Sequence, residues 1–182
     1  MRTLRITLPL FLLLAATAAL SQTPALPQTP ALSQTNAQKS FDQLKSLTGA
    51  WEGKDSQGMP LEVIFRDTAA GSALMSEIHG HGPENMISMI HMDGPNRLMM
   101  THYCGAGNQP RMAATTSPDG KTFTFDFFDG TNLTNSDAGH MQRVVITMLD
   151  ANHHTEDWTF NAGQGKEMKR LFDLHRSELA QK

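Results

Sequence analysis

Charged side chains occur at positions where the alternation of the sequence places apolar ones. Residues two apart in a strand point to the same face, so Glu156 shares its face with Trp158, and Arg170 shares its face with Phe172. If the hairpin between them turns around Gly163, Glu156 lies opposite Arg170. Breaking a buried pair of this kind costs about 3–5 kcal/mol. The pattern therefore indicates either an anion site or an internal ion pair that only fixes the strand register.

A second arginine fits the same pattern. Arg111 shares its face with Ala113, and a turn at 118–120 would set this face against Phe123 and Phe125. We therefore expect Arg111 to point inward and to bind a carboxylate or phosphate as a bidentate fork. An apolar ligand body would lie against the neighbouring aromatic rings. The side chains predicted to bind such a ligand are Arg111, Arg170, Glu156, Trp158, Phe123, Phe125 and Phe172.

Histidine, methionine and cysteine indicate a possible metal site. The turn at 93–96 is predicted to set His91 opposite Leu98, which brings His91 and His102 to one face. Two methionines and Cys104, the single cysteine, share that face, and this set of ligands suits Cu(I). The alternative is that methionine packs the core and that Cys104 is a small buried hydrophobe. The candidate metal ligands are His91, His102 and, on a late strand, His175.

Signals for an enzyme are weak. The sequence contains no Gly-x-Ser-x-Gly, His-Glu-x-x-His or phosphate-loop motif. Glu77 and His79 form an acid–base couple on one strand face, and Glu156 with a nearby histidine is a second candidate. Neither acid–base couple indicates a particular reaction, so the sequence favours a binding protein over an enzyme.

The elements that would position these residues are short strands. Apolar and polar residues alternate in about ten runs, separated by turns rich in glycine, proline, asparagine and aspartate. No helical period lies between the runs, so the chain is predicted to be a single up-and-down antiparallel β-barrel with a short N-terminal helix at 40–47. The predicted strands are 50–55, 60–67, 72–79, 86–92, 97–103, 110–117, 121–128, 141–149, 154–160 and 166–175.

The N-terminal residues are predicted to lie outside the barrel domain. Residues 1–21 combine a basic start, an apolar run too short to span a membrane and small residues, which is the pattern of a signal peptide. Residues 22–37 repeat a proline-containing hexapeptide and indicate a linker, and residues 38–182 form the barrel domain. We therefore expect export to a periplasm or secretion, with no membrane span in the mature chain. A net charge of −3 with scattered lysine and arginine argues against nucleic acid as a partner.

The segment Leu47-Thr48-Gly49-Ala50-Trp51-Glu52-Gly53 follows the predicted helix and opens the first strand. It is similar to the Gly-x-Trp signature of the calycin superfamily, which includes lipocalins, fatty-acid-binding proteins and nitrobindin-like proteins. Exported lipocalin-like proteins of bacteria are the group that the whole chain resembles. The resemblance implies a ten-stranded barrel of the calycin kind, with Gly49 and Trp51 in a structural plug at one end.

The nitrobindin-like branch implies haem, with a late-strand histidine as the iron ligand. Residues 54–60 lack the glycine-rich extension and the Tyr-Pro pair of that branch. His175 would have to supply the ligand, yet it lies on the face opposite Phe172. No cofactor is therefore predicted, and haem remains the alternative.

The function expected from the sequence is an exported protein that holds a small apolar or amphiphilic, anionic molecule inside the barrel. The alternatives are a haem or metal protein, an enzyme acting in the barrel interior, and a barrel filled with side chains that acts through its surface.

Overall fold

The computed structural model describes residues 34–80, 85–135 and 137–177. The predicted signal peptide and most of the predicted linker lie outside these residues. No helix in the described ranges is both long and apolar enough to cross a bilayer.

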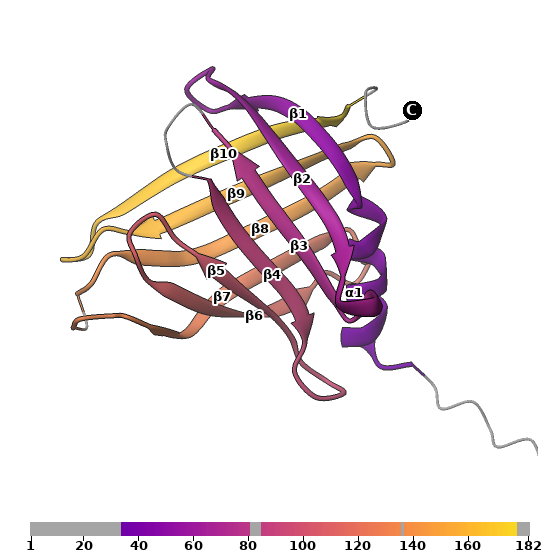
Figure 1. Ribbon diagram of the computed structural model, residues 1–182, viewed down its shortest axis with the longest axis horizontal. Helices are drawn as coiled ribbons and strands as arrows, with labels where there is room; N and C mark the ends of the chain where they lie inside the picture. The colour runs from indigo at the N-terminus through magenta and orange to yellow at the C-terminus, as the bar shows by residue number, and fades with distance from the viewer. Residues whose placement is uncertain (1–33, 81–84, 136, 178–182) are drawn as a thin grey trace, which may run out of the picture. The chain divides into compact units, whose positions relative to one another are not determined.

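Ten antiparallel strands form one closed ring, in which each strand pairs with its neighbours in sequence and β1 pairs with β10 (Figure 1). The predicted fold class is confirmed, and the predicted strand ranges agree with the observed ones to within a few residues. The strands are β1 (Gly49–Asp55), β2 (Pro60–Thr68), β3 (Ala73–His79), β4 (Met86–Met92), β5 (Leu98–Tyr103), β6 (Gln109–Thr116), β7 (Thr122–Thr131), β8 (His140–Asp150), β9 (His153–Asn161) and β10 (Glu167–Arg176).

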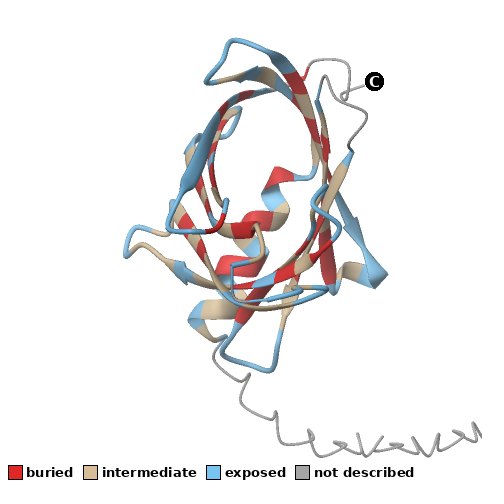
Figure 2. Ribbon diagram, turned by 90° about the vertical axis from the view of Figure 1, so that its left-hand side faces the viewer, coloured by how far each residue is buried: buried red, intermediate tan, exposed pale blue. Residues whose placement is uncertain are grey.

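The helix α1 (Asn36–Leu44) continues into a 3-10 turn at Lys45–Leu47 and lies across one end of the ring. It begins earlier than predicted because the hydroxyl of Thr35 accepts a hydrogen bond from the Gln38 backbone N–H, which caps the first turn. Its apolar face is buried against the barrel core. Figure 2 looks into the ring from the other side, with α1 behind it. We call the end that α1 covers the closed end and the opposite one the open end.

Trp51 lies at the closed end and has no exposed surface. Its Nε1–H donates to the Leu47 carbonyl oxygen at 2.7 Å, and the guanidinium of Arg176 lies over its ring at 4.2 Å from the centroid. Arg176 also donates to backbone carbonyl oxygens of Ser46, Thr48 and Ala151. A cation held over an indole ring adds a favourable electrostatic contact to the packing.

Two glycines of the first strand allow this closure. Gly49 has φ +131°, and a Cβ there would lie 3.0 Å from Nη1 of Arg176. A Cβ on Gly53 would lie 1.8 Å from the carbonyl oxygen of Asp173 on β10. A side chain at Gly53 would push β1 and β10 apart, whereas one at Gly49 would be strained by its positive φ and would displace the Arg176 guanidinium.

Replacing Trp51 by alanine tests the importance of the closed end. We expect Trp51→Ala to lower the free energy of unfolding by about 3–5 kcal/mol, because it removes a large buried side chain and leaves a cavity. Urea unfolding followed by circular dichroism measures the change. Leu149→Ala is the control, since Leu149 is 47% exposed, and it should change the free energy by less than about 1 kcal/mol. Equal losses in the two variants would contradict the structural role of Trp51.

Candidate functional site

A chain of polar side chains lies inside the barrel among apolar ones. Ser88 Oγ and His102 Nδ1 are hydrogen-bonded at 2.9 Å, and the His102 ring lies 5.0 Å from the Trp158 ring between centroids. Trp158 Nε1–H donates to Glu156 Oε2 at 2.9 Å, and Glu156 Oε1 is 3.1 Å from His154 Nε2. All five side chains are buried. Strands β4, β5 and β9 thus bring two histidines and one carboxyl group into the interior.

Burial makes His102 a neutral group. Removal from water lowers the pKa of His102 to about 4, so its imidazole carries no charge at neutral pH. Among the described residues, neither Nε2 of His102 nor Nδ1 of His154 has a hydrogen-bond partner. Both side chains have no exposed surface, so these nitrogens face packed atoms and not open space.

Packing loosens from the closed end towards the open end. Inward-facing residues near α1, such as Val63 and Ile90, have no exposed surface. Further along, Trp158 is 4% exposed and Phe172 is 7% exposed. Phe160, on β9 at the open end, is only half-buried. The last inward-facing aromatic rings therefore form the edge of the packed core.

An ion pair lies above this edge. Arg170 Nη1 donates to Asp55 Oδ2 at 2.6 Å, with the Arg170 side chain 44% exposed and that of Asp55 7% exposed. Partial burial acts to raise the pKa of Asp55, but hydrogen bonds from the Met59 N–H, Arg170 and the Gln57 N–H outweigh it and keep the pKa below its ordinary value. Asp55 is thus a fixed anion that holds the guanidinium at the open end.

Arg170 has aromatic neighbours on the inward face of the β9–β10 hairpin. In the β9–β10 ladder Arg170 lies opposite Trp158, and Phe172 lies opposite Glu156. The rings of Trp158 and Phe172 are 6.1 Å apart between centroids. From the open end inwards, a cation is followed by two aromatic rings and then by the buried carboxyl group.

The prediction that Glu156 faces Arg170 is wrong. The turn between the two strands centres on Gln164 and not on Gly163, because Ala162 N–H donates to the Lys166 carbonyl oxygen at 2.8 Å. This shifts the register by two residues and leaves the faces unchanged. Glu156 instead bonds to side chains of its own strand, so it does not fix the register between strands.

The prediction that Arg111 points inward is also wrong. Arg111 is exposed on the outside of β6, where its Nε donates to Asp129 Oδ1 at 2.6 Å. Met112 and Ala114 face inward instead, and Ala114 lies opposite Phe125. A one-residue shift of register, with an irregularity between Arg111 and Met112, reverses the faces of this strand.

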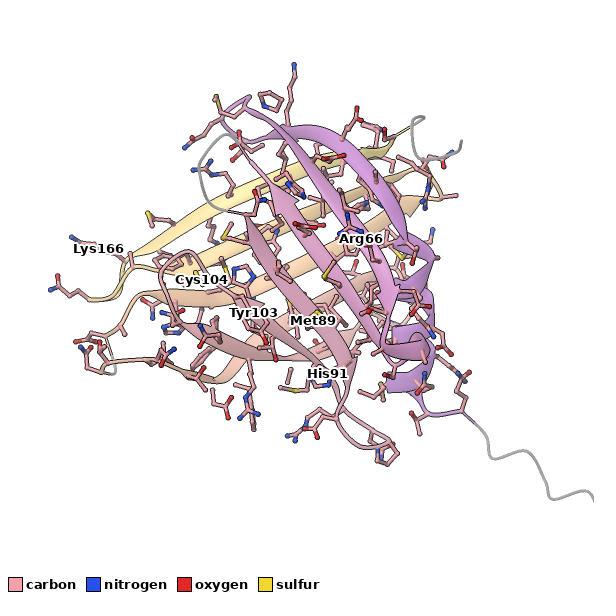
Figure 3. All side chains as sticks on the ribbon, viewed as in Figure 1. Arg66, Met89, His91, Tyr103, Cys104 and Lys166 are labelled. Atoms are coloured by element: carbon pink, nitrogen blue, oxygen red, sulfur yellow. The ribbon has the colours of Figure 1, made fainter. Side chains whose placement is uncertain are left out.

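The predicted metal-binding face does not form. Met99 lies opposite His91, and Ser88 lies opposite His102, one residue away from the predicted register. His102 is therefore inside the barrel, whereas His91 lies outside with Met89 along β4 (Figure 3). The turn holds one more residue than expected, as Asp93 N–H donates to the Arg97 carbonyl oxygen.

Other predicted residues are spread over the molecule. Phe123 and Phe125 are completely buried and belong to the packed core. Glu77 and His79 flank the buried Ile78 and face outward, with Glu77 Oε1 3.4 Å from His79 Nε2, so this couple does not act in the interior. His175 is exposed on the outside of β10, and Cys104 is half-buried just after β5.

Sequence reasoning missed three members of the interior set. These are Asp55, Ser88 and His154. His154 shares its face with Glu156 and Trp158 in the sequence, so alternation alone would have found it.

Comparison with known proteins does not assign this chain to a family. No family model matches the chain, and no curated protein matches it. Rv2717c from M. tuberculosis is 17% identical, with a TM-score of 0.49, covering 76% of this chain and 98% of that one. A redesigned β-barrel is 12% identical, with a TM-score of 0.38, covering 74% and 94%. The structure of EF1p2_mFAP2b bound to DFHBI is 14% identical, with a TM-score of 0.33, covering 76% and 99%. Likenesses at this level assign neither a family nor a ligand to this chain.

The buried His102 predicts a defined dependence of stability on pH. The pKa of a histidine in an unfolded chain is about 6.5, whereas burial lowers the pKa of His102 in the folded protein to about 4. Between these two pH values the unfolded chain therefore binds a proton at this histidine and the folded protein does not. Stability therefore falls as the pH drops from about 6.5 to about 4. Between pH 7.5 and 4.5 the protein should lose about 2–3 kcal/mol more than His102→Gln. Urea unfolding of both proteins measures this difference, and parallel pH profiles would show that His102 is not buried in the neutral form.

Proposed function

We propose that the barrel is a binding protein of the calycin type that holds a small amphiphilic molecule, with an anionic group, at its open end. The observation that carries the proposal is the half-exposed guanidinium of Arg170 at the open end, where Arg170 lies opposite Trp158 and shares the face of Phe172. A cation beside an apolar surface is complementary to an anionic head attached to an apolar body.

The guanidinium of Arg170 has further N–H donors that can bind a ligand. Of its five N–H donors, one on Nη1 has a partner among the residues that the structure describes. Asp55 orients the group and is itself held by two backbone N–H groups of its turn, at 2.8 and 2.9 Å. A carboxylate, sulfonate or phosphate can therefore take the remaining donors without displacing Asp55.

The interior limits the size and charge of the ligand. The side chains near α1 have no exposed surface, so the ligand would occupy the part of the barrel above Trp158 and Phe172. Because the neutral His102 offers no positive charge below them, the anionic group stays at the open end and the apolar part points inward. The apolar part of such a ligand is therefore short, because it extends inward only as far as Trp158 and Phe172.

Two further features support the calycin and export parts of the proposal. Gly49 and Trp51 follow a short helix and lie at the closed end, as the resemblance implies. Export rests on the pattern of residues 1–21.

Haem does not fit the described residues. His175, the histidine that the resemblance would use, lies on the outside of the barrel. The interior histidines His102 and His154 have no exposed surface, so neither offers a nitrogen to a space where iron and its macrocycle would lie.

Two fluorescent probes that differ by one sulfonate test the proposal. We expect 1-anilinonaphthalene-8-sulfonate to bind saturably, and Arg170→Gln to weaken its binding by about 10-fold or more, because a charged hydrogen bond is lost. Binding of uncharged N-phenyl-1-naphthylamine should change little in this variant. Probe fluorescence titration gives both dissociation constants.

The matched control is Arg143→Gln. Arg143 forms a similar half-exposed pair with Asp126, but on the outside of the barrel. This variant should bind both probes like the original protein. If neither probe binds saturably, or if Arg170→Gln and Arg143→Gln give the same constants for the sulfonate, the open end is not the ligand site.

A further inference from the structure

Three potential metal ligands meet on the outside of the barrel, next to its closed end. His153 begins β9, and His175 lies opposite it near the end of β10, with Asp173 two residues earlier on the same face. His153 Nε2 is 2.7 Å from Asp173 Oδ1, and His175 Nε2 is 3.7 Å from the same oxygen. One ligand atom from each of the three residues lies within 4.8 Å of the other two.

We propose that His153, Asp173 and His175 bind one divalent ion of the zinc class. Two imidazole nitrogens and a carboxylate oxygen are a ligand set that suits Zn²⁺, and they are less suited to Mg²⁺ or Ca²⁺, which prefer oxygen alone. Ligands about 2.0–2.1 Å from a tetrahedral ion are about 3.4 Å from one another. The two measured distances lie on either side of that value, and rotation of the exposed side chains can bring all three ligand atoms to one ion. Water or another ligand would complete the coordination.

The imidazole rings of His153 and His175 are stacked against each other. Their centroids are 4.1 Å apart, and their planes differ by 21°. Turning the rings out of this stack would direct one nitrogen of each towards an ion that Asp173 also binds.

The surroundings are open and weakly acidic. The side chains of Asp173 and His175 are 60% and 64% exposed, so an ion reaches them without unfolding. Glu52 lies opposite His175 and Lys54 lies opposite Asp173 on β1, and their charges cancel.

On the other side of the hairpin, strand β8 adds one more negative charge. Asp150 of β8 lies opposite His153. Arg176, the neighbour of His175, turns its guanidinium to the Trp51 ring instead. Asp173 and Asp150 therefore leave the site net negative before the ion binds.

An ion here would join the two ends of one hairpin. It would link the first residue of β9 to the second-last residue of β10, beside the contact that closes the ring. The site is outside the barrel and shares no residue with the open end, so it does not depend on the proposed ligand.

Isothermal titration of the purified protein, free of any histidine tag and pretreated with a chelator, tests the proposal with Zn²⁺. We expect one ion per chain. His175→Gln and Asp173→Asn should each weaken binding by at least 10-fold. His91→Gln is the control, because His91 is on the outside of β4 away from the cluster, and it should bind Zn²⁺ like the original protein.

Thermal unfolding gives a second readout. Zn²⁺ should raise the unfolding temperature of the original protein and of His91→Gln, but not that of His175→Gln. Without metal all three should unfold at similar temperatures, which shows that the substitutions leave the fold intact. The proposal is overturned if no saturable binding occurs at millimolar Zn²⁺, or if both cluster variants bind Zn²⁺ as tightly as the control.

Discussion

The contact between Arg176 and Trp51 joins the last strand to the first, and the rest of the barrel depends on it. The guanidinium covers the indole ring and donates to carbonyl oxygens that precede β1 and β9. Around it, β1 and β10 approach so closely that Gly53 has no room for a side chain. Every strand thereby gains two neighbours, so the ring has no unpaired edge to cover. The aromatic and aliphatic interior is then enclosed on all sides and, at one end, by α1.

That enclosure sets the character of the interior. The residues beside α1 have no exposed surface, and the side chains of His102, His154 and Glu156 are buried in the interior. The packed core ends at Trp158 and Phe172, above which Arg170 and Asp55 meet solvent. A neutral, tightly packed middle and a charged end divide the barrel into a part that stabilises the fold and a part that can bind. The part that stabilises the fold and the part that can bind therefore follow each other along the strands, and both lie on the inward face of the sheet.

The sequence was sufficient for the ten strands and the barrel, because alternation and turn residues are local signals. It was insufficient for strand register, because a hairpin register depends on how many residues the turn holds. The turn from Asp93 to Arg97 encloses one residue more than expected, and the turn from Ala162 to Lys166 is centred one residue later than expected. The shift between β4 and β5 places His91 and His102 on opposite faces instead of on the one face expected, and apolar residues on both faces of β4 gave no signal for the correct register. The shift at β10 kept the faces, so Arg170 with Trp158 and Phe172 was still grouped correctly on one face. The cluster of His153, Asp173 and His175 was not predicted, because only the observed β9–β10 register sets His153 opposite His175.

The order of the strands has a consequence for how the chain folds. Nine of the ten pairings join strands that follow each other in sequence, and one joins strands from opposite ends of the domain. Hairpins between successive strands form early, as their loops are short and cost little entropy. The joint between β1 and β10 must come late, so the nascent sheet exists for a time as an open ribbon with two bare edges. During that interval two copies of the chain can pair edge to edge, and the speed of ring closure decides between a monomeric barrel and an aggregate.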